Sequence, residues 1–421
     1  MEIYDIDPTN ESLFEEYNKN IHKKYAFEKE EIIEAYLDAK KHKSNTKAHV
    51  DFEMNLDSNI NKLLEELQTG TYTISTSTCF VVTLPKPREV FAADFKDRVV
   101  HHILIKPLMP KFEEKLIKNC FSSLPGRGTS LGVIRLSEAM SRHKSGYVYK
   151  FDMQNFFMSI RKDILKEILH KFIIRNCNNK EEQEKLLYLA DLIVMHLPEE
   201  DCTIRCDKNR WKLLPKNKSL FYTDILCGLA IGNITSQLFA NLYLNEFDHW
   251  MYSIFGDDYG RYVDDFFIVT DDKNLVKKLI PKIEKYLLEK LGLTLHKNKR
   301  YCQPVSHGCS FLGSVIKGER IYVGNGTVSN LHEVVHKLNL VDKKKYKNLV
   351  DCIRSLNSYL GFMAYDDAYD IIKRELSRLD PSWYDYVYII SEPLTEKDIA
   401  KGKRSRVKVQ LRPEYKILNN L

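Results

Sequence analysis

Residues 261–269, Arg-Tyr-Val-Asp-Asp-Phe-Phe-Ile-Val, decide the fold of this chain. The adjacent carboxylates Asp264 and Asp265 precede a run of apolar, β-favouring residues over 266–270. Turn-forming residues occupy 256–260, so the pattern predicts a β-hairpin that carries the Asp pair at its tip. Two like charges side by side on a strand are costly unless a cation neutralises them. Mg²⁺ is the usual cation where carboxylates handle phosphates.

A third carboxylate stands in a similar context. Residues 146–152, Gly-Tyr-Val-Tyr-Lys-Phe-Asp, predict a short strand that ends in Asp152. Nucleotidyl transfer with two metal ions needs carboxylates on adjacent strands, bridging ions about 3.5–4 Å apart. An acidic pair alone is common on solvated hairpins, so it is Asp152 that favours a metal site formed with Asp264 and Asp265.

Composition sets broad limits on the protein. The chain has 421 residues, 43% hydrophobic and 29% charged, which is typical of a soluble globular protein. This length predicts two or three domains of about 100–200 residues each. The net charge of +6 does not by itself indicate a nucleic-acid partner, but from Lys397 onward eight Lys/Arg stand against two Asp/Glu.

The sequence predicts no membrane association and a cytoplasmic location. The N-terminal residues lack a signal pattern, and no apolar run approaches the ~18–20 residues of a membrane span. Nine cysteines are scattered along the chain, and the closest spaced pair, Cys202 and Cys206, has no matching second pair. Reduced thiols are therefore expected rather than a zinc site.

The remaining elements follow from apolar periodicity and turn residues. Residues 199–221 are polar and predict an irregular surface insertion. Helices are expected over 11–42, 50–67 with Gly70 as its stop, 97–119, 159–172, 181–197, 238–255, 274–291 and within 329–379. Strands are expected over 71–85 and 89–93 as a hairpin with a basic tip, 293–299 leading into a basic turn, and 309–316 paired with 320–323.

Two loops have the chemistry of ligand contacts. Residues 124–129, Leu-Pro-Gly-Arg-Gly-Thr, precede a helix, and backbone amides at a helix N-terminus together with Arg127 suit a phosphate. Residues 228–237 contain two glycines and four polar side chains at the start of another helix. Capping explains one or two of these polar residues, and the whole set suggests close approach of a ligand to the backbone.

The order of these features, with Phe151-Asp152, Tyr262-Val-Asp-Asp265 and Phe311-Leu-Gly313, resembles the reverse transcriptases over about residues 71–380. The resemblance implies an α+β right-hand polymerase fold with fingers, a ferredoxin-like palm of antiparallel sheet plus helices, and a helical thumb. The implied parts are an N-terminal helical segment (1–70), fingers (71–145), palm (146–325, with the insertion at about 199–221), thumb (326–385) and a basic C-terminal tail (386–421).

The resemblance also assigns the metal site. Asp152 and Asp264 would be the principal ligands of two Mg²⁺ ions, with Mn²⁺ as a possible substitute. Asp265 would help hold the site, and the backbone of Met153 would help ligate the ion that carries the nucleotide. Lys299 matches a basic turn near the pyrophosphate, where it could protonate the leaving group; Lys297 is the competing choice.

Further residues match nucleotide and nucleic-acid contacts. Phe157 matches the aromatic residue that lies under the sugar and excludes a 2′-hydroxyl, although a plain core Phe is the alternative. Arg88 matches the fingers arginine over the incoming nucleotide, because a planar guanidinium can both stack and bind phosphate. The other nucleotide contacts that the resemblance implies are Ile231, Gly232 and Gln237. The template and primer contacts that it implies are Arg127, Gly128, Asn233, Ser236, Tyr262, Phe311, Leu312 and Gly313.

One motif departs from most of the family. Residues 231–237 read Ile-Gly-Asn-Ile-Thr-Ser-Gln, where most reverse transcriptases have Gln-Gly-x-x-x-Ser-Pro. This variant resembles the enzymes of bacterial and phage diversity-generating retroelements. It implies copying of a template-repeat RNA into cDNA with errors at adenines, for mutagenic retrohoming. The implied partners are template RNA, cDNA primer and product, deoxynucleotides, and an accessory variability protein that is a basic helical homopentamer.

Other interpretations remain open at this point. The chain could be another bacterial reverse transcriptase, of the retron, group II intron-like or abortive-infection type. A non-catalytic RNA-binding relative is expected to have a broken carboxylate set, whereas Asp152, Asp264 and Asp265 are all present. The basic end after Lys397 could bind RNA or the accessory protein, or be a disordered solvated tail.

Overall fold

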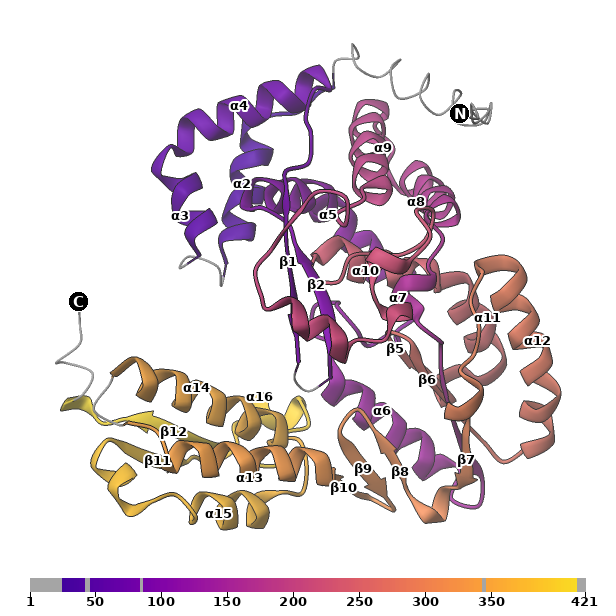
Figure 1. The fold of residues 1–421 in the computed structure, drawn as a ribbon. Coiled ribbons are helices and arrows are strands. Elements are labelled where there is room, and N and C mark those ends of the chain that lie inside the picture. Colours follow the sequence, from indigo (N-terminus) through magenta and orange to yellow (C-terminus); the bar gives the residue numbers. More distant parts are fainter. Residues whose placement is uncertain (1–24, 42–45, 84–85, 343–345, 415–421) are drawn as a thin grey trace. The chain divides into compact units, whose positions relative to one another are not determined.

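The computed structural model describes residues 25–41, 46–83, 86–342 and 346–414 (Figure 1). The first part of the helix expected over 11–42 lies outside these ranges. The chain divides into two compact units: residues 1–117, 153–249 and 282–295 form unit 1, and residues 118–152, 250–281 and 296–421 form unit 2. Helices and mainly antiparallel strands confirm the α+β class.

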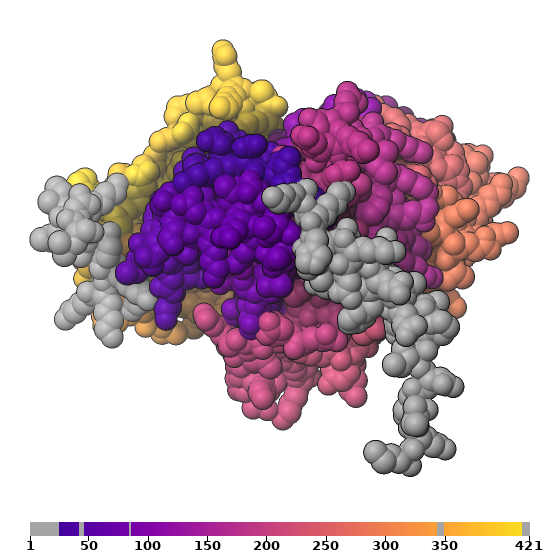
Figure 2. Space-filling model, turned by 90° about the horizontal axis from the view of Figure 1, so that it is seen from above, coloured from indigo at the N-terminus to yellow at the C-terminus, as the bar shows by residue number. Residues whose placement is uncertain are grey.

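The described part of unit 1 begins with three helices, drawn in indigo in Figure 1: α2 (Lys29–Lys40), α3 (Lys47–Met54) and α4 (Leu56–Thr69). Figure 2 shows the atoms of this segment in the same colour. The single helix expected over 50–67 is broken at Asn55, a residue type that forms helices poorly. Gly70 ends α4 as predicted, with φ of 73° and its N–H donated to the carbonyls of Glu66 and Leu67.

The predicted fingers hairpin is present in unit 1. Strands β1 (Ser77–Val82) and β2 (Arg88–Ala92) pair antiparallel, and β4 (Cys202–Ile204) pairs parallel with β1. The remaining helices of the unit are α5 (Phe95–Lys115), α7 (Phe156–Ser159), α8 (Lys162–Asn176), α9 (Lys180–Met195) and α10 (Ile234–Tyr243); α11 (Asn245–Phe255) and α12 (Lys273–Leu291) contribute to both units.

The segment 199–221 differs from its prediction as an irregular surface insertion. It supplies β4 and the short 3-10 helices η1 (Lys208–Leu213), η2 (Lys216–Lys218) and η3 (Leu220–Tyr222). Its anchor is the buried carboxylate of Glu89 on β2, which accepts hydrogen bonds from Trp211 Nε1 at 2.6 Å, Ser219 Oγ at 2.7 Å and the Leu220 N–H at 2.7 Å. A buried carboxylate is tolerated when its hydrogen bonds are satisfied, so this segment is an integral part of the unit.

Unit 2 contains a four-stranded antiparallel sheet in the order β5-β6-β3-β7. Its strands are β3 (Tyr147–Asp152), β5 (Tyr259–Tyr262), β6 (Asp265–Thr270) and β7 (Tyr301–Pro304). Helix α6 (Thr129–Arg142) packs on it, with Val133, Leu136 and Met140 in one core with Val148 and Phe267. The strand expected over 293–299 is wrong, because the strand lies at 301–304 and pairs with β3.

A second antiparallel sheet in unit 2 consists of β8 (Cys309–Phe311), β9 (Ser314–Lys317) and β10 (Arg320–Val323). The sequence predicted one strand over 309–316, but a turn at Leu312 and Gly313 divides it. Both residues have positive φ, 48° and 91°. Glycine is needed at 313, because a Cβ there would lie 2.9 Å from Cζ of Phe362.

The C-terminal part of unit 2 is helical as predicted, with α13 (Asn325–Asn339), α14 (Tyr346–Met363) and α15 (Tyr369–Leu376). The alternative of a disordered tail after Lys397 is wrong for the residues that the structure describes up to position 414. Strands β11 (Val387–Ser391) and β12 (Val407–Leu411) form a hairpin around α16 (Glu396–Ala400), drawn in yellow in Figure 1. Val387 and Val409 are buried in the same core as Leu331 and Leu356. None of the helices in the described ranges combines the length and apolar character needed to cross a bilayer.

Candidate active site

The predicted acidic hairpin is confirmed. Tyr262 pairs with Asp265 across β5 and β6, which leaves Val263 and Asp264 as a two-residue turn. Strand β6 pairs in turn with β3, so that Asp152 lies directly opposite Asp265. Opposed residues on antiparallel strands have Cβ atoms about 4.5–5.5 Å apart. The structure therefore brings Asp152 beside the hairpin that carries Asp264 and Asp265, more than a hundred residues later in the chain.

The electrostatics of this group favour a cation. Burial raises the pKa of Asp265 to about 7, and the negative charges of Asp264 and Asp152 add to the rise. The positive charges of Lys299 and Lys150 oppose it. A divalent cation would relieve the repulsion, and carboxylate oxygens are the ligands that Mg²⁺ prefers. The chemistry of these ligands thus fits the expected metal. Among the described residues, no group of three or more His, Cys, Asp or Glu side chains lies close enough together to hold an ion in this structure.

A lysine already contacts one of these carboxylates. Lys299 Nζ lies 2.7 Å from Oδ2 of Asp152. Lys299 closes the 3-10 turn η5 (Lys297–Lys299), and the preceding His296 donates its N–H to the Asp152 carbonyl at 2.8 Å. The turn is therefore fixed to the end of β3, and of its two lysines it is Lys299 that reaches the acidic group.

Two of the three carboxylates and the predicted primer contacts share an open pocket of about 380 Å³ in unit 2. Its lining includes Asp152, Asp265 and Lys299 as well as Phe311, Leu312 and Gly313. Lys150 also lines it and was missed by the sequence analysis. Its Nζ hydrogen-bonds the Ser310 carbonyl and lies over the Tyr301 ring. The signal was available, because residues 150 and 152 of one strand point to the same face.

In the predicted phosphate loop before α6, Arg127 forms hydrogen bonds within its own unit. Arg127 Nη1 donates to the Cys120 carbonyl at 2.9 Å, and the Arg127 N–H donates to the Leu124 carbonyl at 3.1 Å. Arg127 and Gly128 are both partly exposed. Tyr262, the first residue of the Tyr-Val-Asp-Asp motif, is half-buried and packs on the core that contains Phe121 and Phe267.

The other predicted nucleotide contacts lie in unit 1. Phe157 is half-buried and packs, together with Ile231, on a cluster formed by Cys79, Phe91, Met158 and Leu220. Arg88 is the exposed first residue of β2, the strand that also carries Phe91. Met153 is buried and forms an isolated antiparallel bridge with Leu295. The structure thus places Phe157 and Ile231 at one cluster that includes residues of β1 and β2.

Residues 231–233 are tied to β2 through their backbone. The Ile231 carbonyl accepts the Phe91 N–H at 2.9 Å, and Asn233 Oδ1 accepts the Ala93 N–H at 3.2 Å. A Cβ on Gly232, at φ of 130°, would lie 2.9 Å from the Phe91 carbonyl oxygen. Close packing on β2 by itself accounts for this glycine, and the expected approach of a ligand to residues 228–237 stays a prediction.

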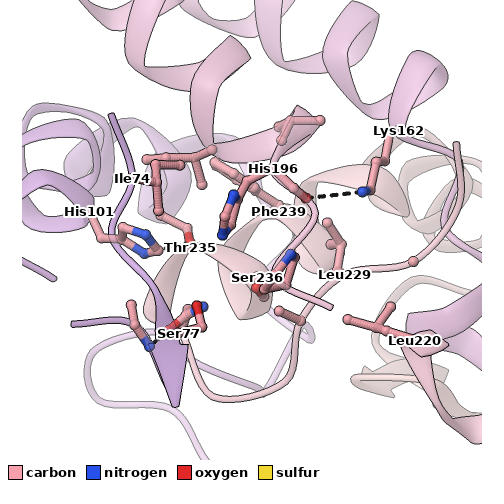
Figure 3. Close-up of a pocket in the computed structure, with 17 residues that line it drawn as sticks. Ile74, Ser77, His101, Lys162, His196, Leu220, Leu229, Thr235, Ser236 and Phe239 are labelled. Carbon is pink, nitrogen blue, oxygen red and sulfur yellow. Dashed lines mark hydrogen bonds between the residues drawn. The ribbon is translucent and has the colours of Figure 1, made fainter. Parts of the chain in front are cut away.

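A polar cavity lies next to this loop (Figure 3). Ser236, a predicted template contact, is buried and lines it with Thr235, whereas Gln237 is exposed. His101 Nδ1 lies 3.0 Å from Thr235 Oγ1, and the buried Lys162 donates to the His196 carbonyl at 3.1 Å. The cavity measures about 30 Å³, which holds a water molecule or two and excludes a nucleotide.

Burial controls the charges around this cavity. It lowers the pKa of His101 to about 3 and that of His196 to about 4, so both imidazoles are neutral at neutral pH. Burial also lowers the pKa of Lys162. The cavity is therefore part of the interior of unit 1.

Comparison with known proteins identifies one family. A model described as "Reverse transcriptase (RNA-dependent DNA polymerase)" matches residues 85–316. A search of curated proteins gave no match. Among solved structures, telomerase from Candida albicans in complex with a TWJ fragment of telomeric RNA is 13% identical over 78% of this chain and 60% of that one, with a TM-score of 0.42. Apo telomerase from Candida tropicalis is 12% identical over 72% of this chain and 58% of that one, with a TM-score of 0.44. The chain thus spans about 60% of the length of these proteins, and the scores are too low to transfer any function from them.

Proposed function

Because the chain belongs to the reverse transcriptase family, we propose that it is an RNA-directed DNA polymerase that extends a primer by copying template RNA. The pairing of Asp152 with Asp265 beside the Asp264 turn carries this proposal. All three carboxylates lie within the matched residues 85–316. Asp152 and Asp265 are paired in one sheet, and Asp264 is in the turn between two of its strands. Such an arrangement suits the positioning and charge neutralisation that nucleotidyl transfer requires.

The proposed cofactor is a pair of Mg²⁺ ions, with Mn²⁺ as a substitute. Asp152 and Asp264 would hold both ions, Asp265 would support them, and the backbone of Met153 would add a ligand. When bound, such ions lower the charge repulsion between primer hydroxyl and triphosphate. The elevated pKa of Asp265 supports this proposal, because burial first, and then the charges of Asp264 and Asp152, make a bare carboxylate unfavourable at this position, and a bound cation would relieve that cost.

Side chains of this protein would perform the other tasks of the reaction. The primer 3′-hydroxyl loses its proton to solvent and attacks the α-phosphate of a deoxynucleotide, the bond to pyrophosphate breaks, and the leaving oxygen takes up a proton. Lys299 Nζ would donate that proton. Arg88 would stabilise the negative charge that develops on the phosphates in the transition state. Phe157 would exclude a 2′-hydroxyl. Residues 311–313 would hold the primer in the pocket that they share with Asp152 and Asp265.

Primer extension tests this proposal. Purified protein is given an RNA template, an annealed DNA primer and deoxynucleotides, and product length is followed on a gel. Extension with Mg²⁺ or Mn²⁺, its loss with a chelator, and its recovery on adding metal are the expected results. Binding of the hybrid without extension under any metal would instead indicate a non-catalytic RNA-binding protein.

For the biological role we propose mutagenic retrohoming by a bacterial or phage diversity-generating retroelement. The supporting observation is the motif Ile231-Gly-Asn-Ile-Thr-Ser-Gln237, whose first residue cannot form the hydrogen bonds of the usual Gln. The proposed partner is a basic, helical, homopentameric accessory protein in the same cytoplasm. Neighbouring genes test the role: two near-identical repeats that differ at adenines are expected, whereas a structured RNA gene and a branched RNA–DNA product would indicate a retron.

A further inference from the structure

Arg261 is completely buried, which is unusual for an arginine, because charged side chains are mostly exposed. Its backbone is fixed on both sides, since its N–H donates to the Asn119 carbonyl and its carbonyl accepts the Phe121 N–H, each at 2.9 Å. Its guanidinium reaches along the hairpin, where Nη1 donates to the Val263 carbonyl at 2.7 Å. Nη2 lies 3.5 Å from Sγ of Cys120.

The carbonyl that Arg261 holds belongs to a strained turn. Val263 has a φ of 58°, at the first position of a two-residue hairpin loop where glycine is the usual residue. A β-branched residue avoids this conformation unless its surroundings impose it. The Val263 N–H donates to Oγ of the buried Ser122 at 3.3 Å. The N–H of Val263 is therefore held by Ser122, and its carbonyl is held by Arg261.

We infer that Arg261 is a positioning residue, which fixes the Val263–Asp264 peptide and thereby sets the position of the Asp264 carboxylate. The peptide carbonyl of Val263 is bonded to the nitrogen of Asp264, so its orientation determines where the Asp264 side chain begins. The inference rests on the proposed role of Asp264 as a metal ligand. Lysine cannot replace arginine here, because one ammonium group lacks the rigid fork that reaches the carbonyl and the thiol together.

Kinetics of the Arg261→Lys variant test the inference, with Arg142→Lys as the matched control. Arg142 belongs to the same unit and pairs with Asp258 at 2.7 Å, away from the Val263 turn. Because a 1 Å misplacement costs about 100-fold in rate, Arg261→Lys is expected to lower kcat at least about tenfold. The Mg²⁺ concentration for half-maximal rate should rise several-fold. The KM for deoxynucleotide and the Kd for an RNA–DNA hybrid should stay within about twofold of wild type, as they should in Arg142→Lys.

The additional substitution Val263→Gly distinguishes a positioning role of Arg261 from a role in folding alone. Glycine adopts a positive φ without strain, so Val263→Gly added to Arg261→Lys should recover part of the lost kcat. A lesion that acted only through folding would lower the melting temperature and would not be rescued. If Arg261→Lys does not fold, Ser122→Ala is expected to show the same loss of kcat and raised Mg²⁺ requirement in weaker form. Wild-type behaviour of Ser122→Ala would then overturn the inference.

The Mg²⁺-induced rise in melting temperature gives a readout that does not need catalysis. It should be smaller in Arg261→Lys than in the wild type and in Arg142→Lys. If the wild type shows this rise but extends no primer, the proposed function fails and the positioning role stands. If Arg261→Lys matches Arg142→Lys in kcat, Mg²⁺ requirement and melting shift, the positioning role is wrong whatever the enzyme does.

Discussion

Lys299 Nζ lies 2.7 Å from Oδ2 of Asp152, so a carboxylate expected to bind metal is paired with a cation of the protein itself. The Lys299 side chain is half exposed, whereas that of Asp152 is largely buried. The ion pair can therefore separate easily, because an exposed ammonium loses little free energy when it exchanges a carboxylate for water or a phosphate.

The variant Lys299→Met should lower kcat by about 100-fold, because a general acid typically contributes 10²–10⁴-fold to a rate. The Mg²⁺ requirement should not rise, since the substitution removes a competitor for Asp152. Single-nucleotide incorporation across a range of Mg²⁺ concentrations measures both effects. Lys297→Met is the matched control from the same turn, and a larger effect there would transfer the role to Lys297.

A substitution at Ile231 tests the proposed source of low fidelity. Ile231→Gln should reduce misincorporation opposite template adenine by about threefold to tenfold, because a glutamine can hydrogen-bond near the templating pair. Ile231→Leu keeps the packing against Phe91 and Leu220 and should leave the error rate unchanged. Sequencing of cDNA made from an adenine-rich template measures the errors. Equal error rates in both variants would remove position 231 from the explanation.

The variant Phe157→Val should admit ribonucleotides. Discrimination against a 2′-hydroxyl is expected to fall by about 100-fold, while Phe157→Tyr, which retains the ring, should remain selective. The cluster around Met158 should lose about 1–3 kcal/mol of stability on truncation. Competition between matched ribo- and deoxynucleotides gives the ratio. Lost stability with unchanged selectivity would show that Phe157 is only a core residue.

Asp366 links the stability of unit 2 to pH. It is buried, accepts a hydrogen bond from Ser314 Oγ at 2.8 Å, and its Oδ2 has no partner among the described residues. Burial raises its pKa from 3.8 to about 6. The folded state therefore keeps a proton that the unfolded state loses between about pH 4 and 6, and stability falls as pH rises through this window.

The variant Asp366→Asn should abolish that loss, because the amide is never charged and its oxygen can still accept from Ser314. Its free energy of unfolding should exceed that of wild type by about 1–3 kcal/mol at pH 8, with little difference at pH 4. Urea denaturation at the two pH values measures the change. A variant that is less stable at pH 8 would contradict the assignment of a buried charge.

The sequence predicted the acidic hairpin and the Asp152 strand because turn residues and β-favouring runs flank them. Elements that are determined by contacts with residues distant in the sequence were not predicted correctly. Residues 293–299 resemble a strand because Leu293 and Leu295 alternate with polar residues, yet the sheet uses β7 instead. The role of Arg261 was hidden because a charged side chain is normally expected at the surface.

Two polar segments were hidden for a related reason. Residues 199–221 have the composition of a surface loop, and only the buried carboxylate of Glu89 in another strand explains their order. The end of the chain is basic, but its alternating apolar residues, such as Val407 and Val409, complete the core of the C-terminal helices. In both segments the apolar or hydrogen-bonding partners lie far away in the sequence, where local patterns carry no information.

Incorporation of a single deoxynucleotide by Asp264→Asn tests whether the carboxylates of the acidic hairpin perform nucleotidyl transfer. The control is Asp271→Asn, an exposed aspartate of the same unit that pairs with His143. Rates on an RNA template are measured beside the affinity for the RNA–DNA hybrid. We expect Asp264→Asn to bind the hybrid normally but to lose incorporation by at least about 1,000-fold, while Asp271→Asn behaves as wild type. If Asp264→Asn incorporates at close to the wild-type rate, this hairpin is not the catalytic site.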